Sequence, residues 1–151
     1  MAYDRTGTSR WVWLKAVGTQ EEPLAADWRL RERNNLLLRV WFSKHPRSIR
    51  GGDLLVYYAA RHGVMPAIVE VVSDHVDEHL SEERWKWSME VRPIVLLGLR
   101  EAPTIYDSLI DPLRVRRQSH IRLEPHEFAQ LRALILDAAA ASVQLDDAVA
   151  A

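Results

Sequence analysis

The chain has 151 residues, 48% of them hydrophobic and 27% charged, a composition typical of one globular domain rather than a disordered or fibrous chain. It contains no cysteine, which excludes disulfides, thiolate metal sites and a cysteine nucleophile. The formal net charge of -1 excludes a uniformly basic surface of the kind that binds nucleic acid without selectivity.

The N-terminal segment 1–10 is polar and lacks the apolar core of a secretory signal. No apolar run in the chain approaches the length that spans a bilayer. We therefore expect a cytoplasmic protein with no membrane partner.

The first half of the chain contains three predicted strands. Arg10–Val17 alternates apolar and other residues, which predicts the first strand, whereas Glu21–Phe42 lacks this alternation and favours one or two short helices. A glycine turn then leads into Leu54–Tyr58, which reads as a buried strand. The β-branched stretch Met65–Asp74 predicts the next strand, and the short "RHG" connection favours a hairpin between the two.

An acidic segment separates this hairpin from a long predicted strand. Asp74–Glu83 has no apolar stripe and is expected to form an exposed loop or a short helix. Arg84–Leu97 reads as a long strand, in which Pro93 should lie at an edge or a bulge because proline cannot donate to the ladder.

The last third of the chain predicts a short helix, a brief strand and a closing helix. Pro103–Pro112 suits one short helix, Ser119–Leu123 a brief strand, and Pro125 the first residue of a helix whose tail should fray from Ala139. Residues 1–151 should therefore form a single α+β domain, with a curved, mostly antiparallel sheet and flanking helices.

Basic and acidic side chains are unevenly distributed in spite of the neutral total. Arg29–Arg50 holds seven basic residues and one acid, and Arg114–Arg122 holds four arginines and no acid, whereas acids collect between Glu70 and Glu83. If the two basic segments share one face, they would create a local positive field. The alternative is that both are ordinary solvated surfaces.

Several strings resemble, in chain order, the EVE domain of the PUA-like superfamily, a relative of the YTH readers of methylated RNA. They are "GGDLLVYYA", "AIVEVVSD", "WSMEVRPIVLL" and "RRQSHIRLEPHEFAQLRALI", and "RNNL" resembles the family's Arg-Asn segment. Lys15 and Glu22-Pro23 match parts of the family's Lys-Ser-Glu-Pro segment, whose serine is missing here. The resemblance covers residues 10–136.

The resemblance implies a PUA-like pseudo-barrel that binds one flat heterocycle, a modified or flipped base of DNA or RNA, without catalysis or a cofactor. Aromatic faces stack on a base with about 1–3 kcal/mol each, polar side chains read its edge, and arginines hold the flanking phosphates. The base-pocket candidates are Trp13, Lys15, Trp28, Asn34, Tyr57, Trp87, Gln118 and Ser119. The phosphate-binding candidates are Arg31, Arg33, Arg116 and Arg117.

The tryptophans each have a core interpretation beside the pocket interpretation. Trp85 and Trp87 share a strand face with Met89 and Val91, a pattern typical of core, so we assign one of the pair to each role, with Trp87 in the pocket and Trp85 at the sheet margin. Trp28 lies in a polar, arginine-flanked segment where an exposed indole would cover a base or stack on arginine.

Other candidate residues also have ordinary structural roles. Tyr57 and Tyr58 point to opposite faces of their strand, so only one can line a given pocket. Asparagines in "RNNL" cap turns as commonly as they read bases. His75 and His79 would clamp a metal only on a helix and lack a third ligand, so solvated loop histidines are the favoured interpretation and we assign no metal.

Two other functions remain open. A small ribonuclease of the ASCH type, also PUA-like, would stabilise charge at phosphorus with basic side chains, but the Gly-x-Lys-x-x-Glu-x-Arg string associated with ASCH domains is absent. A sensor of a free small heterocycle would use the same pocket without a polymer. Neither a Gly-rich phosphate loop nor a nucleophile elbow is present in the sequence.

Overall fold

The computed structural model describes residues 10–30, 35–115 and 118–150. Its strands are β1 (Val12–Val17), β2 (Arg39–Phe42), β3 (Leu54–Ala59), β4 (Val64–Val71), β5 (Asp77–Glu78), β6 (Trp87–Leu96) and β7 (His120–Leu123). Its helices are the 3-10 turns η1 (Trp28–Leu30), η2 (Ile105–Asp107) and η3 (Pro112–Arg114), and the long α1 (Pro125–Ala150).

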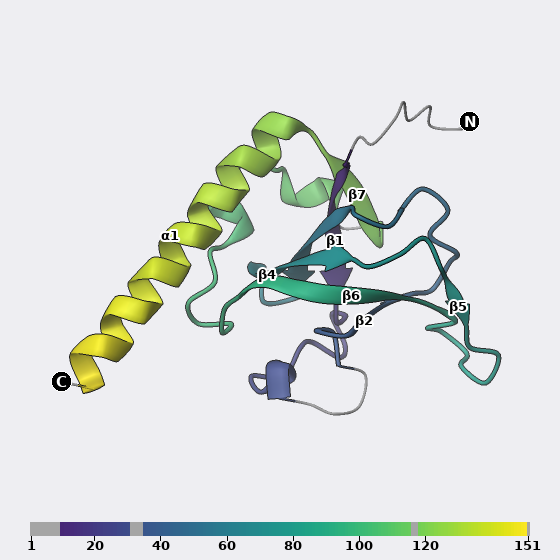
Figure 1. Ribbon diagram of the computed structural model, residues 1–151, viewed down its shortest axis with the longest axis horizontal. Coiled ribbons are helices and arrows are strands. Elements are labelled where there is room, and N and C mark those ends of the chain that lie inside the picture. The colour runs from purple at the N-terminus through teal and green to yellow at the C-terminus, as the bar shows by residue number, and fades with distance from the viewer. Residues whose placement is uncertain (1–9, 31–34, 116–117, 151) are drawn as a thin grey trace.

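The strands form one mixed sheet in the order β2-β6-β4-β3-β1-β7, with the short β5 added beside β6. The pair β1 and β3 is parallel, and the other paired strands of the described chain are antiparallel. The α1 helix lies along one side of this sheet (Figure 1). The prediction of a small α+β fold with a mostly antiparallel sheet is therefore confirmed.

The sheet curls until its two ends meet. In the strand order β2 stands at one end and β1 and β7 at the other, yet Lys15 Nζ of β1 lies 5.0 Å from the ring centroid of Phe42 in β2. The ring of His120 in β7 also lies edge-on to Phe42, with centroids 5.5 Å apart. These contacts turn an open sheet into a partial barrel whose interior is lined by its concave face.

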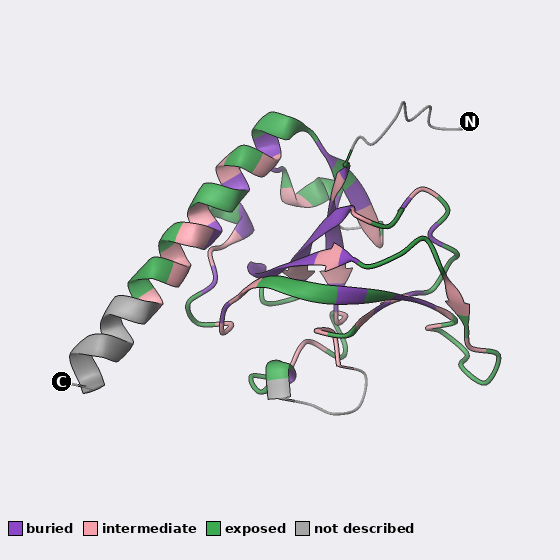
Figure 2. Cartoon of the chain, in the orientation of Figure 1, coloured by how far each residue is buried: buried purple, intermediate pink, exposed green. Residues whose placement is uncertain are grey.

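Alternation along the strands divides the buried side chains between the two faces of the sheet. One cluster includes Leu55 and Tyr57 from β3 with Trp13 and Phe42, and the other includes Val56 from β3 with strand and helix residues. Figure 2 shows the buried residues concentrated on the strands and the exposed ones along the outer side of α1. Tyr57 and Tyr58 lie on opposite faces, as the alternation predicted.

The closing helix begins as predicted at Pro125. Glu127 accepts a hydrogen bond from the backbone N–H of Glu124 at 3.0 Å and forms an ion pair with Arg114, an arrangement that satisfies the exposed start of the helix. The helix runs to Ala150, and fraying of the tail from Ala139 stays a prediction.

Two segments depart from their predictions. Asp74–Glu83, expected as a loop or a short helix, contains strand β5, which pairs with β6. Within Glu21–Phe42 the helical content of the described part is the single turn η1, and Arg39–Phe42 forms strand β2. Hydrogen bonding to β6 decides the conformation of these four residues, which are too few to show a period of two in the sequence. In β6, Pro93 does lie at a bulge, where the register against β4 shifts between Ile68 and Val69.

A buried carboxylate fixes the start of the parallel pair. Asp53 is 1% exposed. Its carboxylate accepts hydrogen bonds from the main-chain N–H of Trp11 at 3.1 Å, the indole N–H of Trp13 at 3.0 Å and the main-chain N–H of Arg50 at 3.0 Å. The side chain therefore joins the beginning of β1 to the turn before β3. This fixes Val12 opposite Leu54 in the ladder.

We predict that Asp53→Asn lowers the free energy of unfolding by about 2–4 kcal/mol, because an amide cannot accept all three bonds and buries its own unmatched donors. Urea denaturation measures the change. The matched control is Asp74→Asn, whose exposed carboxylate accepts the Gly51 N–H at 2.7 Å and should cost less than about 1 kcal/mol. Equal losses for the two variants would contradict the role given to Asp53.

Candidate functional site

A cavity of about 550 Å³ opens on the inner side of the curled sheet, a size typical of small-molecule sites. We call it the tryptophan cavity. It is lined by Lys15, Ala16, Val17, Gly18, Thr19, Glu22, Pro23, Leu24, Ala25, Trp28, Leu36, Trp41, Glu82, Arg84 and Trp85. Strand β1, the segments that follow it, β2 and the loop before β6 all contribute to the wall.

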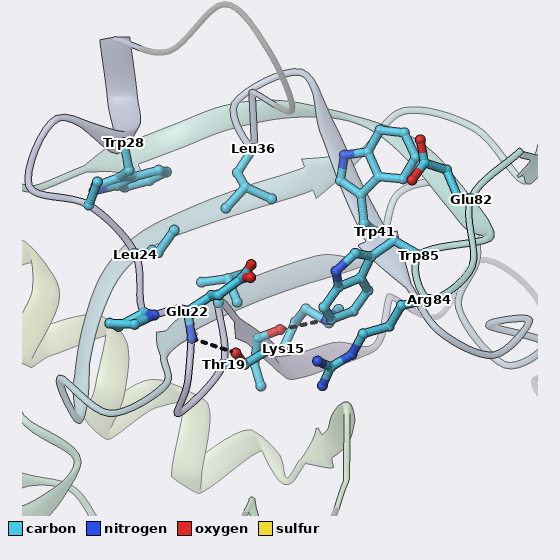
Figure 3. A pocket seen from close by; sticks show the side chains of 15 residues that line it. Lys15, Thr19, Glu22, Leu24, Trp28, Leu36, Trp41, Glu82, Arg84 and Trp85 are labelled. Atoms are coloured by element: carbon cyan, nitrogen blue, oxygen red, sulfur yellow. Dashed lines mark hydrogen bonds between the residues drawn. The ribbon is translucent and has the colours of Figure 1, made fainter.

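Three indoles form the flat walls of the cavity. Trp28 of η1 lies on one side, and Trp41 of β2 and Trp85 before β6 lie on the other (Figure 3). Trp28 is 3% exposed and stands edge-on to Tyr57, with ring centroids 6.3 Å apart. The Tyr57 hydroxyl donates to the backbone carbonyl of Leu36 at 2.6 Å, so the tyrosine ties the strand to the wall segment.

Lys15 brings an amine into this aromatic surrounding. Its side chain is 1% exposed, and Nζ donates to the Ala16 carbonyl at 2.5 Å and lies 5.7 Å from the ring centroid of Trp85. No carboxylate of the described residues forms an ion pair with it. Burial lowers the pKa of Lys15 from 10.5 to about 7.

His120 is the cross-strand neighbour of Lys15 in the β1–β7 ladder. Its ring meets the edges of Trp13 and Phe42, with centroids 5.4 and 5.5 Å away. Burial and, secondly, the positive charge of Lys15 lower the pKa of His120 to about 4. The imidazole is therefore neutral at physiological pH and serves as part of the barrel interior rather than as a second cation.

The mouth of the cavity is charged. Glu22, Glu82 and Arg84 are exposed there, and the Arg84 guanidinium lies 5.2 Å from the ring centroid of Trp85. The loop bearing Glu22 turns at Gly18, whose φ of 69° favours glycine and whose added Cβ would come within 2.9 Å of the Leu24 nitrogen. The Glu22 N–H donates to Thr19 Oγ1 at 2.9 Å, which closes this turn.

A polar network supports Trp41 from outside the cavity. The His79 ring packs on Trp41 with centroids 4.5 Å apart, and His79 Nε2 lies 2.7 Å from Ser88 Oγ. Arg39 donates to Ser88 Oγ at 3.0 Å and to Asp77 at 2.5 Å. Hydrogen bonds from Arg39 and then from His75 lower the pKa of Asp77.

The two histidines of "HVDEH" have separate partners in this network. His75 bonds Asp77 at 2.8 Å, whereas His79 bonds Ser88. Among the described residues no three His, Asp or Glu side chains gather as a metal site.

The structure brings two predicted pocket residues, Lys15 and Trp28, into the cavity wall and places Tyr57 directly behind it. Trp28 is buried rather than exposed as expected, because its ring packs on Tyr57 and its backbone N–H bonds Ala25 in a tight turn. Trp13 lies in the core, where its N–H bonds Asp53. Gln118 and Ser119 lie outside the cavity.

The assignment of Trp85 and Trp87 is reversed. Trp85 lines the cavity, whereas Trp87 stands in β6 opposite Phe42 and packs edge-on against His45, with centroids 4.8 Å apart. The strand begins at Trp87, so its alternation does not extend back to Trp85. The remaining candidates, Asn34, Arg31, Arg33, Arg116 and Arg117, lie outside the described residues.

Sequence reasoning did not find Trp41 or the contribution of the acidic loop. Trp41 was assigned to a helical segment, and its strand face became evident only from the pairing of β2 with β6. Glu82 comes from the segment predicted as an exposed loop or short helix, and Arg84 from the start of the predicted long strand; both are exposed and precede β6. The adjacent "RW" at 84–85 was the one available signal, since arginine beside an indole is a common stacking pair.

No family model matches the chain, and no curated protein is similar to it. Several solved structures are similar, among them the following two. Protein Atu2648 from Agrobacterium tumefaciens has a TM-score of 0.48 at 16% identity, over 80% of this chain and 90% of that one. Protein Rpa0253 from Rhodopseudomonas palustris has a TM-score of 0.47 at 13% identity, over 86% and 93%. These comparisons assign neither a family nor a function.

A search of the described helices for a membrane span found none that is sufficiently long and apolar.

We predict that Lys15→Met stabilises the protein, and that the gain is largest below pH 7. The folded-state pKa of about 7 lies below the ordinary 10.5, so the unfolded chain binds more protons between these values. Stability of the parent protein therefore rises through this window, by about 1.4 kcal/mol per pH unit. Urea denaturation at pH values of about 6, 8 and 10 measures the free energy of unfolding of both proteins, and the difference between them should shrink as the pH rises.

Lys86→Met, at an exposed lysine, is the matched control and should show no such trend. The other charged or titratable groups around Lys15 are His120, Glu22, Glu82 and Arg84, and they are present in both variants. A gap between Lys15→Met and the parent protein that stays constant with pH would show that the amine does not titrate in this window.

Proposed function

We propose that this chain is a non-catalytic binding module, an EVE-type member of the PUA-like superfamily, whose tryptophan cavity holds one modified or flipped base of DNA or RNA. The observation that carries this proposal is the presence of three indoles around a cavity of about 550 Å³. A base leaving its stack needs new flat partners, and each aromatic face supplies about 1–3 kcal/mol.

The geometry suits a flat ligand. Trp28 lines the cavity on one side and the pair Trp41 and Trp85 line it on the other, so a ring lying between them would be flanked by aromatic side chains (Figure 3). The apolar side chains of Leu24 and Leu36 also line the space, which favours an added methyl-type group over a charged one. Lys15 lies at the inner part of the wall, where it would meet an edge of the base.

Contact with a polymer requires cations around the mouth. Arg84 lies there in the structure, and the other proposed phosphate-binding residues, Arg31, Arg33, Arg116 and Arg117, lie outside the described residues. Phosphate contacts of this kind make affinity fall with salt and carry no sequence information.

A second candidate function is a sensor of a free small heterocycle. Glu22 and Glu82 are exposed at the mouth, and two carboxylates there oppose the approach of phosphates. This function predicts that a nucleoside binds as tightly as an oligonucleotide and that added salt has little effect.

We predict that Trp85→Ala weakens binding of short single-stranded DNA or RNA by about 5- to 100-fold, because one stacking face is lost. Fluorescence anisotropy of labelled strands at low and high salt measures the change, and intact folding is checked by circular dichroism. Trp87→Ala is the matched control, since it removes an indole of intermediate burial two residues away that does not line the cavity. It should alter affinity less than about threefold.

Equal losses in the two variants would contradict the assignment of the site. If strands bind no more tightly than nucleosides at either salt concentration, the result would contradict binding of a nucleic-acid strand and favour a sensor of a free heterocycle.

A further inference from the structure

Two buried hydrogen-bond donors in the wall of the tryptophan cavity lack an acceptor. Within the described part of the chain, no atom accepts a hydrogen bond from the indole N–H of Trp28 or of Trp41, and water does not reach either nitrogen. Buried tryptophan N–H groups usually find a partner. Both residues line the same cavity, so the two unmatched donors lie within one wall, and each ring has to shift slightly before its nitrogen can meet a ligand.

The orientation of Trp41 agrees with a role toward the ligand. Figure 3 shows the nitrogen-bearing edge of its ring on the side that faces Leu36 and Trp28 across the cavity. His79 packs on the Trp41 ring from outside the cavity. The indole is therefore held between the polar network and the cavity. A small shift of the ring on ligand entry would bring its N–H into contact.

Lys15 adds a third buried donor to the same wall. Its amine is buried, and its one described hydrogen bond runs to the Ala16 carbonyl, which leaves further N–H groups for a ligand. The carboxylates of the wall, Glu22 and Glu82, are exposed at the mouth. Among the side chains of the wall, three donors are therefore buried, whereas the carboxylate acceptors are exposed.

We propose that the tryptophan cavity selects a planar heterocycle that presents carbonyl oxygens, of the uracil type, over one that presents amino groups, of the cytosine type. The oxygens would accept from the Trp28 and Trp41 N–H groups and from Lys15 Nζ. An exocyclic amino group at the same position would meet a donor and leave both groups unpaired. For a base within a strand this rests on the proposed function, whereas the selectivity itself rests on the cavity.

The test compares two DNA strands of adenines that differ in one central base, uracil or cytosine, together with free deoxyuridine and deoxycytidine. Titration calorimetry gives each affinity. We expect the uracil strand to bind at least about fivefold more tightly than the cytosine strand, the same order for the two nucleosides, and tighter binding of strands than of nucleosides.

Trp28→Phe and Trp41→Phe remove one donor each and keep a flat apolar wall. Each should weaken uracil binding by about three- to tenfold and leave cytosine binding nearly unchanged, so the preference falls. Trp87→Phe, outside the cavity, should keep the full preference. Thermal melting checks folding, and Trp41→Phe, at the less buried of the two sites, keeps the test valid if Trp28→Phe unfolds.

The outcomes separate the two proposals. Equal or tighter binding of the cytosine strand, still lost in Trp85→Ala, would overturn the donor selectivity and leave base binding in place. If deoxyuridine binds more tightly than deoxycytidine but strands bind no more tightly than nucleosides, the selectivity is supported and the proposal of a nucleic-acid strand as ligand is overturned. Absence of binding to all four ligands would overturn both.

Discussion

The Asp53 carboxylate is the point at which the first and third strands, the turn before β3 and a core indole are held together. It accepts the main-chain N–H groups of Trp11 and Arg50 and the indole N–H of Trp13. A parallel strand pair has no hairpin to set its register, so a side chain that bonds both strands must supply the alignment. The register of β1 in turn decides which of its residues face the barrel interior, and Lys15 is one of them.

Lys15 shows that the barrel interior is not optimised for stability alone. An apolar side chain would fill the same place between Phe42 and Trp85 without the desolvation that lowers the pKa of the amine. Strongly perturbed ionisable groups in a cavity are a feature of functional sites. The desolvated amine of Lys15 and the unmatched donors of two indoles lie in one wall, so this wall is a part of the molecule that lowers its stability.

Strands were predictable from alternation in β1, from an apolar run after a glycine turn in β3 and from β-branched residues in β4, and the start of α1 was predictable from Pro125. Strand β2 was not, because only Val40 and Phe42 of its four residues are buried and its partner β6 lies far away in sequence. The reversed roles of Trp85 and Trp87 have a related cause. Alternation predicts which face of the sheet a residue occupies only within a paired strand, and Trp85 lies before β6 begins. The resemblance in sequence predicted Lys15 as a pocket residue. Its burial was not predictable, because it depends on the curl of the sheet that brings Phe42 of β2 next to it.

The parallel pairing of β1 with β3 also bears on how such a protein would diversify. Because a parallel pair cannot be closed by a tight turn, segment 18–53 has to travel the length of the sheet, and it supplies Trp28, Leu36 and Trp41 to the cavity on its way. Much of the cavity wall is therefore formed by the segment that connects β1 to β3. Insertions, deletions and substitutions there would change the accepted ligand while the strand register stays fixed, so ligand preference is free to diverge faster than architecture.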